Sequence, residues 1–142
     1  MEVAFSLLYV SSTNLNFPDG NKEVDDIVSG SLQRNARLGV TGALISTPSY
    51  FAQVLEGPHA AIAELMTSIL RDPRHRDLKV VSETDLPKPL FAGWSLAYSG
   101  YASYVDRYIE PLFSPMSAPD AARLSRRLIR LMQEFTTLRP PV

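Results

Sequence analysis

Cysteine is absent from this chain of 142 residues. Without it the protein can form no disulfide, thiol nucleophile or thiolate-bound zinc site. No apolar run approaches the roughly 20 residues of a membrane span, and the opening Met-Glu-Val-Ala-Phe lacks the basic start of a secretion signal. The net charge of −1 indicates neither a nucleic-acid partner nor an anionic membrane. These absences predict a soluble, cytoplasmic domain.

Residue sets that carry catalysis are missing as well. The two histidines, His59 and His75, lie far apart in the sequence, and no Ser/His/Asp set, metal-ligand cluster or glycine-rich phosphate loop accompanies them. We therefore expect no enzyme activity and no metal site. The apolar content of 45% and the charged content of 20% are those of an ordinary globular protein.

Apolar residues recur in patterns that predict strands and helices in turn. Short β-prone runs indicate five strands, and i, i+3, i+4 spacing indicates two helices, the second with Pro58 as its first residue. The predicted strands are 3–10, 39–46, 50–56, 78–82 and 94–98, and the predicted helices are 24–36 and 58–71, with a loop over 11–21. The order β-α-β-β-α-β-β predicts an α+β fold, a ferredoxin-like sandwich with one added strand.

Such a sandwich leaves one sheet face bare, and the C-terminal residues can cover it. A capping pattern at Ser117 precedes a predicted helix, and a weaker, mobile segment is expected at 101–113. The apolar stripe of this helix is Leu124, Leu128, Leu131, Met132 and Phe135, and its basic stripe is Arg123, Arg126, Arg127 and Arg130. The arginines are either an ordinary solvated face or a surface for a partner or for self-association.

Three separate segments can build one site around Tyr9, Gln53 and Trp94. Strand alternation places Gln53 on the same face as Phe51 and Leu55, so that an amide lies between apolar neighbours. A buried amide without partners costs about 1–3 kcal/mol, so a hydrogen-bonding group is expected beside it.

Five motifs in this chain, in order and spacing, resemble those of a BLUF domain, a flavin-binding blue-light sensor. They are LLYVSS at 7–12, RNARLGVTGAL at 34–44, FAQVLEG at 51–57, DPRH at 72–75 and FAGW at 91–94. The resemblance implies a flavin-binding domain over residues 1–99 and a helical cap over 100–142. The short tail is similar to that of the stand-alone members of the family.

The resemblance implies a photoactive pair. Tyr9 matches the tyrosine that gives an electron and a proton to the excited flavin, and Gln53 matches the glutamine that bridges this tyrosine to the flavin. An amide suits that role because flipping or tautomerising reverses the donor and acceptor that it presents. The alternatives are a tyrosine ring that only packs in the core and an edge-strand amide that faces water.

Further positions match cofactor-binding residues of the family. Asn35 matches the asparagine that orients the ring, although the pattern Asn-x-x-x-Gly at a helix end, here ending at Gly39, can also be a C-terminal cap. Arg74 and His75 match residues near the ribityl-phosphate end, with Asp72 adjacent, although such a charged turn can simply be solvated. The expected apolar lining is Ile27, Phe51, Leu55 and Ile69. The cofactor implied is FAD, with FMN as an alternative.

Trp94 matches a residue that reports the state of the pocket, although a lone tryptophan can also be a core anchor. Leu96 stands where many members of the family carry methionine, two residues after this tryptophan. Leucine has a similar volume but no thioether and less flexibility. The two are therefore expected to form the signal relay, and whether Leu96 alters the output stays open.

The function that this resemblance implies is signalling without turnover. Blue light is expected to change the hydrogen bonds of Gln53, and the change to reach a downstream protein in trans through the C-terminal part. A homo-oligomer is also expected. The alternative is a light-insensitive ferredoxin-like binding or assembly module.

Overall fold

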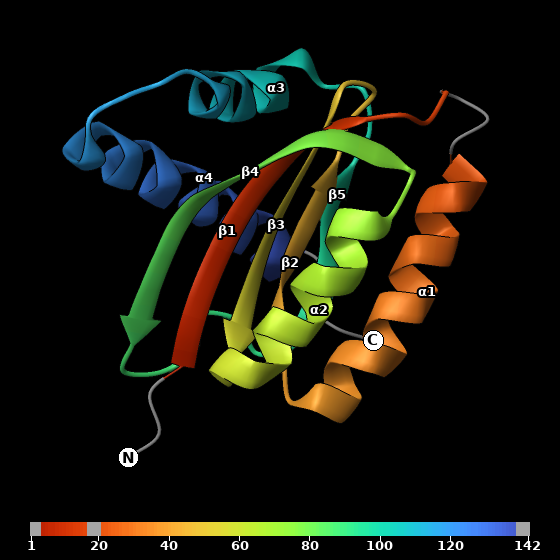
Figure 1. The fold of residues 1–142 in the computed structure, drawn as a ribbon. Helices are drawn as coiled ribbons and strands as arrows, with labels where there is room; N and C mark the ends of the chain where they lie inside the picture. The colour runs from red at the N-terminus through yellow and green to blue at the C-terminus, as the bar shows by residue number, and fades with distance from the viewer. Residues whose placement is uncertain (1–3, 17–20, 139–142) are drawn as a thin grey trace.

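The computed structural model describes residues 4–16 and 21–138, and a mixed sheet forms the centre of this part of the chain (Figure 1). Its strands are β1 (Ala4–Thr13), β2 (Thr41–Ser46), β3 (Tyr50–Gly57), β4 (His75–Leu86) and β5 (Trp94–Ser99). The strand order is β4-β1-β3-β2-β5, with β5 parallel to β2 and all other neighbours antiparallel. The predicted ferredoxin-like fold with an added strand is therefore confirmed.

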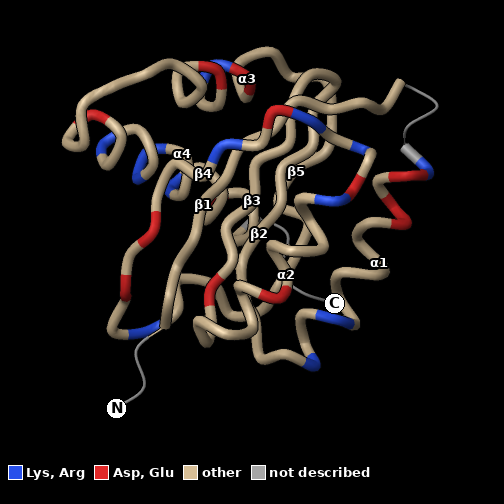
Figure 2. Tube along the Cα trace, viewed as in Figure 1, with Lys and Arg blue, Asp and Glu red and all other residues tan. Residues whose placement is uncertain are grey.

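Helices cover both faces of the sheet. They are α1 (Asn21–Leu38), α2 (His59–Arg71), α3 (Ser103–Ile109), the short 3-10 helix η1 (Glu110–Phe113) and α4 (Ala118–Leu138). Helices α1 and α2 lie on one face, and α3 and α4 lie on the other (Figure 1). In α1, Glu23 lies in the first turn beside Lys22, and Arg37 lies in the last turn, so that Glu23 and Arg37 suit the helix dipole; Figure 2 shows the charged residues of α1 gathered toward its two ends.

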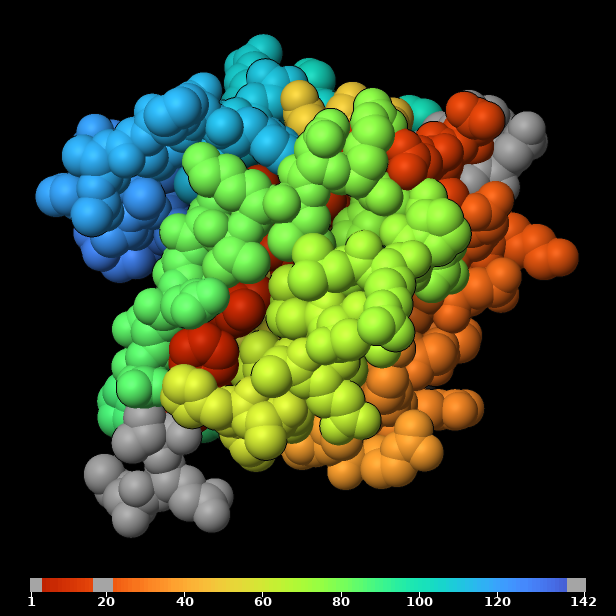
Figure 3. Space-filling model, in the orientation of Figure 1, coloured from red at the N-terminus to blue at the C-terminus, as the bar shows by residue number. Residues whose placement is uncertain are grey.

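The two faces bury two separate apolar cores. Beneath α1 and α2, the first core contains Leu7, Val24, Leu55, Ile62 and Leu65. The second core joins the sheet to α3, η1 and α4 and includes Leu8, Val10, Val54, Ile109, Leu112, Leu128 and Met132. Alternate residues of β1 and β3 thus enter opposite cores, so both central strands are fixed from both sides. In the space-filling view β1 is visible only as a narrow strip between α2 and β4 (Figure 3).

Strands β1 and β4 are longer than their apolar patterns predicted. Strand β1 continues to Thr13 and β4 begins at His75, because Ser12 pairs with Arg76 and Thr13 with His75. The prediction of a loop from residue 11 was therefore wrong for 11–13, and its part at 17–20 lies outside the described residues. Pro58 is also not the first residue of α2 but the residue before it, with an extended ψ of 140°.

The C-terminal cap contains more helix than its sequence indicated. The segment 101–113 contains α3 and η1, and its expected mobility stays a prediction. Helix α4 begins as predicted, with the backbone N–H of Asp120 donating to Ser117 Oγ over 3.3 Å. Two arginines of the basic stripe bind within the chain, since Arg127 lies 4.4 Å above the Tyr108 ring and Arg123 lies 3.6 Å from Asp120. None of the described helices combines the length and apolarity that a membrane crossing requires.

Gly42 allows β2 and β3 to pair closely, which gives a first prediction. Its φ is +147°, and a Cβ at this position would lie 1.9 Å from the carbonyl oxygen of Val54. We expect Gly42→Ala to lower the free energy of unfolding by about 3 kcal/mol or more, because backbone atoms cannot yield as a flexible side chain would. Chemical denaturation in the dark measures this change.

The matched control is Gly30→Ala in α1. A Cβ at Gly30 meets nothing within 4 Å, so this substitution should stabilise the helix by about 0.5–1 kcal/mol. Equal effects of the two substitutions would contradict the assigned role of Gly42.

Candidate functional site

A cleft opens between α1, α2 and the sheet, and it collects most of the predicted site residues. The space between these elements, including the part that is open to solvent, is about 520 Å³. The lining residues are Tyr9, Ile27, Ser31, Arg34, Leu44, Phe51, Gln53, Ser68, Ile69, Asp72, Arg74 and His75. Six elements and the turn after α2 thus contribute side chains from positions far apart in the sequence.

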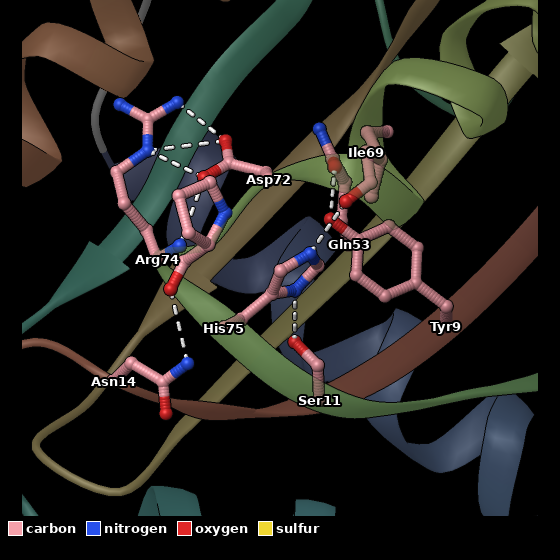
Figure 4. Close-up of polar contacts among 9 residues, drawn as sticks. Tyr9, Ser11, Asn14, Gln53, Ile69, Asp72, Arg74 and His75 are labelled. Atoms are coloured by element: carbon pink, nitrogen blue, oxygen red, sulfur yellow. Dashed lines mark hydrogen bonds and ion pairs between the residues drawn. The ribbon is translucent and has the colours of Figure 1, made fainter.

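Tyr9 and Gln53 meet at the floor of this cleft. They are directly opposite in the pairing of β1 with β3, and the Tyr9 hydroxyl donates a hydrogen bond of 2.6 Å to Gln53 Oε1. Their exposed fractions are only 4% and 5%. Because β3 is a central strand, the alternative of an edge-strand amide facing water is wrong. The Gln53 amide nitrogen points away from Tyr9 (Figure 4), so a donor is left for another group.

The electrostatics at Tyr9 keep its hydroxyl protonated. Burial raises the pKa of Tyr9, and the nearby negative charge of Asp72 raises it further, whereas Arg34 acts in the opposite direction. A neutral phenol that donates to an amide oxygen is therefore the resting arrangement. Removing its proton requires an event that makes the phenol far more acidic, such as the loss of an electron from the ring.

The turn after α2 carries an ion pair at the rim of the cleft. Arg74 Nη2 lies 2.5 Å from Asp72 Oδ2, and Arg74 Nε donates to both oxygens of the same carboxylate (Figure 4). Partial burial alone would raise the pKa of Asp72, but the hydrogen bonds from the Arg74 side chain and backbone outweigh it and lower the pKa. This charged turn is ordered by its own contacts and is not merely solvated.

His75 ties the end of α2 to the first strand. One ring nitrogen, Nε2, lies 2.7 Å from the carbonyl oxygen of Ile69, and Nδ1 lies 2.7 Å from Ser11 Oγ (Figure 4). Since a carbonyl can only accept, Nε2 carries the proton. The imidazole also contacts the rings of Tyr9 and Phe51 edge-on, with centroids 6.1 Å away. His75 therefore closes one side of the cleft.

Two predicted cofactor-binding residues do not line the cleft. Leu55 is fully buried in the first core. Asn35 is also buried, and its Oδ1 has no hydrogen-bond partner among the described residues. The alternative, a C-terminal cap at Asn-x-x-x-Gly, is present in the backbone, because α1 ends at Leu38, Gly39 follows it with a φ of +71°, and Val40 N donates to the carbonyl oxygen of Asn35 over 2.8 Å. This cap uses the backbone carbonyl of Asn35. Its adjacent residue, Arg34, does line the cleft.

Four lining residues were missed in the sequence. Ser31 and Arg34 follow Ile27 at spacings of four and seven, so helical periodicity could have placed them on the same face of α1. Ser68 precedes Ile69, and Leu44 lies opposite Gln53 in the pairing of β2 with β3. The signal at Leu44 was only that of an ordinary apolar strand residue.

Trp94 and Leu96 lie beside the cleft and not in its lining. Trp94 is 6% exposed and packs in the first core, with Leu96 packed against it. Its indole Nε1 has no hydrogen-bond partner within the described part of the chain. Leu96 pairs with Leu44, and the register then shifts so that Tyr98 pairs with Ile45. This irregularity turns Tyr98 toward the second core, where its ring stacks on Phe135 of α4 at 5.0 Å.

The cleft combines apolar walls with an amide donor and charged side chains. The walls of Ile27, Phe51 and Ile69 are apolar, and the Gln53 amide offers a donor between them. Arg34 and Arg74 also line the cleft, and Arg74 is paired there with Asp72. No cluster of three or more possible metal ligands occurs within residues 4–16 and 21–138.

Comparisons with known proteins agree with this chemistry. The family described as "BLUF: Sensors of blue-light using FAD" matches residues 4–97. A photoactivated adenylate cyclase subunit beta of Euglena longa is 33% identical over 92 residues, which are 64% of this chain and 10% of that protein. The blue light- and temperature-regulated antirepressor BluF of Escherichia coli (strain K12) is 37% identical over 57 residues, which are 40% of this chain and 14% of that protein.

A solved structure matches over nearly its whole length. The dark-state structure of BlrB, a BLUF protein, has a TM-score of 0.71 at 26% identity and covers 94% of this chain and 98% of its own. The chain spans only about a tenth of the length of the cyclase subunits that it matches.

The raised pKa of Tyr9 predicts a pH dependence of stability. The unfolded chain releases this proton near pH 10, whereas the folded chain retains it, so the stabilisation is complete below about pH 10 and is lost as the pH rises further. We expect the free energy of unfolding of Tyr9→Phe to fall less steeply with pH in this range, by up to about 1.4 kcal/mol per pH unit. Urea unfolding in the dark at several pH values tests this, and parallel curves for the two proteins would contradict it.

Proposed function

The chain belongs to the BLUF family of sensors of blue light using FAD, and we propose that Tyr9 and Gln53 are its photoactive pair. The observation that carries this proposal is the buried hydrogen bond of 2.6 Å between them. It joins a protonated phenol to an amide whose nitrogen is still free to donate. No other polar pair among the cleft residues described combines a redox-active ring with a group that can reverse its hydrogen bonding.

A bound flavin supplies absorption of blue light and an acceptor for one electron. Tyr9 is placed to give up that electron, and its Oη proton can leave along the hydrogen bond toward Gln53 Oε1. When the proton and the electron return to Tyr9, the amide of Gln53 can be left flipped or tautomerised, with a new pattern of donor and acceptor. The altered amide then holds the lit state until it reverts thermally.

We further propose that the cofactor is FAD, with FMN as the alternative. Ile27, Phe51 and Ile69 would pack against the ring, and the orphaned Oδ1 of buried Asn35 would accept from its polar edge. Arg74, with Asp72 and His75 beside it, would lie toward the ribityl-phosphate end, where a guanidinium can bind phosphate oxygens. Leu55 would support the ring through the core behind it.

The output is proposed to be a change in binding to a downstream protein in trans, without turnover by this chain. We propose residues 1–99 as the sensing unit and 100–142 as the cap that passes its state on. Relatives named as adenylate cyclase subunits and as an antirepressor support coupling to effectors of different kinds. The homo-oligomer stays a prediction.

Tyr9→Phe tests the proposed photoactive pair. The phenylalanine ring can still pack against His75, but it carries no hydroxyl proton to transfer. We expect this variant to retain bound flavin and to lose the red-shifted absorption that blue light produces in the wild type. The absorption spectrum before and after illumination measures both properties.

Tyr104→Phe is the matched control, because Tyr104 is an exposed tyrosine on α3. It should keep the full red shift. A normal shift in Tyr9→Phe would show that another residue is the donor. A wild-type protein that binds flavin but gives no shift would instead support the light-insensitive module.

Leu96→Met tests whether the relay needs a thioether. Leu96 is half-buried and lies opposite Leu44 of the cleft, so its shape affects the pocket wall. Because cores tolerate volume-conserving apolar swaps best, we expect the light-induced change in backbone amide exchange across β5 to stay close to that of the wild type. A several-fold larger response in the methionine variant would show that the thioether matters.

A further inference from the structure

One buried carboxylate lies outside the proposed photoactive pair. Glu56 is on β3, three residues after Gln53, and its exposed fraction is 0%. It faces the second core, since its neighbours at alternate positions, Ala52 and Val54, are buried there. A charge at such a position is costly unless hydrogen bonds compensate for it.

Three donors converge on this carboxylate. Leu90 N donates to Oε2 over 2.7 Å, and Phe91 N donates to Oε1 over 3.1 Å. Thr41 Oγ1 donates to Oε1 over 2.9 Å. Both oxygens are therefore used, and a carboxylate, which only accepts, matches all three donors.

The two backbone donors lie in the segment 87–93, between β4 and β5. Their N–H groups precede β5 and so have no partner in the sheet ladder. Phe91 is buried in the second core, and Trp94 opens β5 three residues later. Gly93 is fixed separately, because its carbonyl oxygen accepts from Gly42 N over 3.0 Å.

We infer that Glu56 is a positioning residue that binds the segment 87–93 to β3 and thereby sets where β5 and Trp94 begin. Gln53 and Glu56 share one strand, so a displacement of β3 at Gln53 moves the acceptor that holds Leu90 and Phe91. The positioning role rests only on the contacts of Glu56. Its part in passing the lit state to β5 rests also on the proposed function.

Glu56→Gln tests the inference with little change in shape. The new Nε2 would present a donor to a backbone N–H, so at least one of the two backbone hydrogen bonds is lost. In the dark we expect amide exchange at Leu90 and Phe91 to become roughly tenfold faster or more, the scale for losing a hydrogen bond to a charged group. Hydrogen–deuterium exchange of peptides over 87–96 measures it.

Thr41→Val is the matched control, because it removes a donor to the same carboxylate and leaves both backbone bonds in place. It should change exchange at Leu90 and Phe91 by less than about threefold. If Glu56→Gln does not fold, Leu90→Pro tests the same contact, because proline lacks the N–H that donates to Glu56 Oε2. Leu90 is 42% exposed, so the core does not depend on its side chain. Leu90→Pro should speed exchange at Phe91 and Trp94 in the same way.

Illumination separates the two parts of the inference. In the wild type we expect light to change exchange across β5, whereas Glu56→Gln should keep the red shift of the flavin and lose that change. Equal dark exchange in Glu56→Gln and the wild type would overturn the positioning role, and an unaltered light response of β5 in the variant would overturn the relay. A wild type without a red shift would overturn the proposed function, while the dark comparison would still decide the role of Glu56.

Discussion

The hydrogen bond between Tyr9 and Gln53 is the constraint on which the rest of the structure depends. Both groups are polar and buried, so each would be costly without the other. Their contact requires β1 and β3 to be neighbours in one register, because a slip of one residue would turn each side chain to the other face. Two helices must then cover that face to keep water away, and α1 and α2 do so while leaving the cleft above the pair.

Strand β5, like β1 and β3, contributes side chains to both cores. Trp94 and Leu96 belong to the first core, beside the cleft, whereas Tyr98 belongs to the second. The shift in register after Leu96 causes this change of side. Tyr98 also accepts a hydrogen bond of 3.0 Å from Ala102 N, just before α3, and stacks on Phe135 of α4. A strand with this geometry cannot move on one face without disturbing the helices on the other.

The sequence predicted the order of the elements because apolar periodicity is strong in α2, β3 and α4. The full length of β1 and β4 could not be predicted, since Ser12, Thr13, His75 and Arg76 are polar and become strand residues only by pairing with each other. Tyr9 and Gln53 could be joined only through a family resemblance, as they lie 44 residues apart. Helical periodicity could have identified Ser31 and Arg34 as cleft residues. The contact of Glu56 with the segment 87–93 could not be predicted, because the sequence does not show that this segment lies against β3.

In the proposed function, β3 is the strand through which a rearrangement of the Gln53 amide would displace other parts of the structure. Phe51 and Leu55 pack in the first core, while Ala52 and Val54 pack in the second, so β3 is held from both sides. Close-packed interiors transmit displacement because few voids exist to absorb it. A shift of β3 therefore passes to its neighbours along the sheet and, through Glu56, to the segment that leads into β5. The same packing that isolates Gln53 from water connects it mechanically to the C-terminal helices.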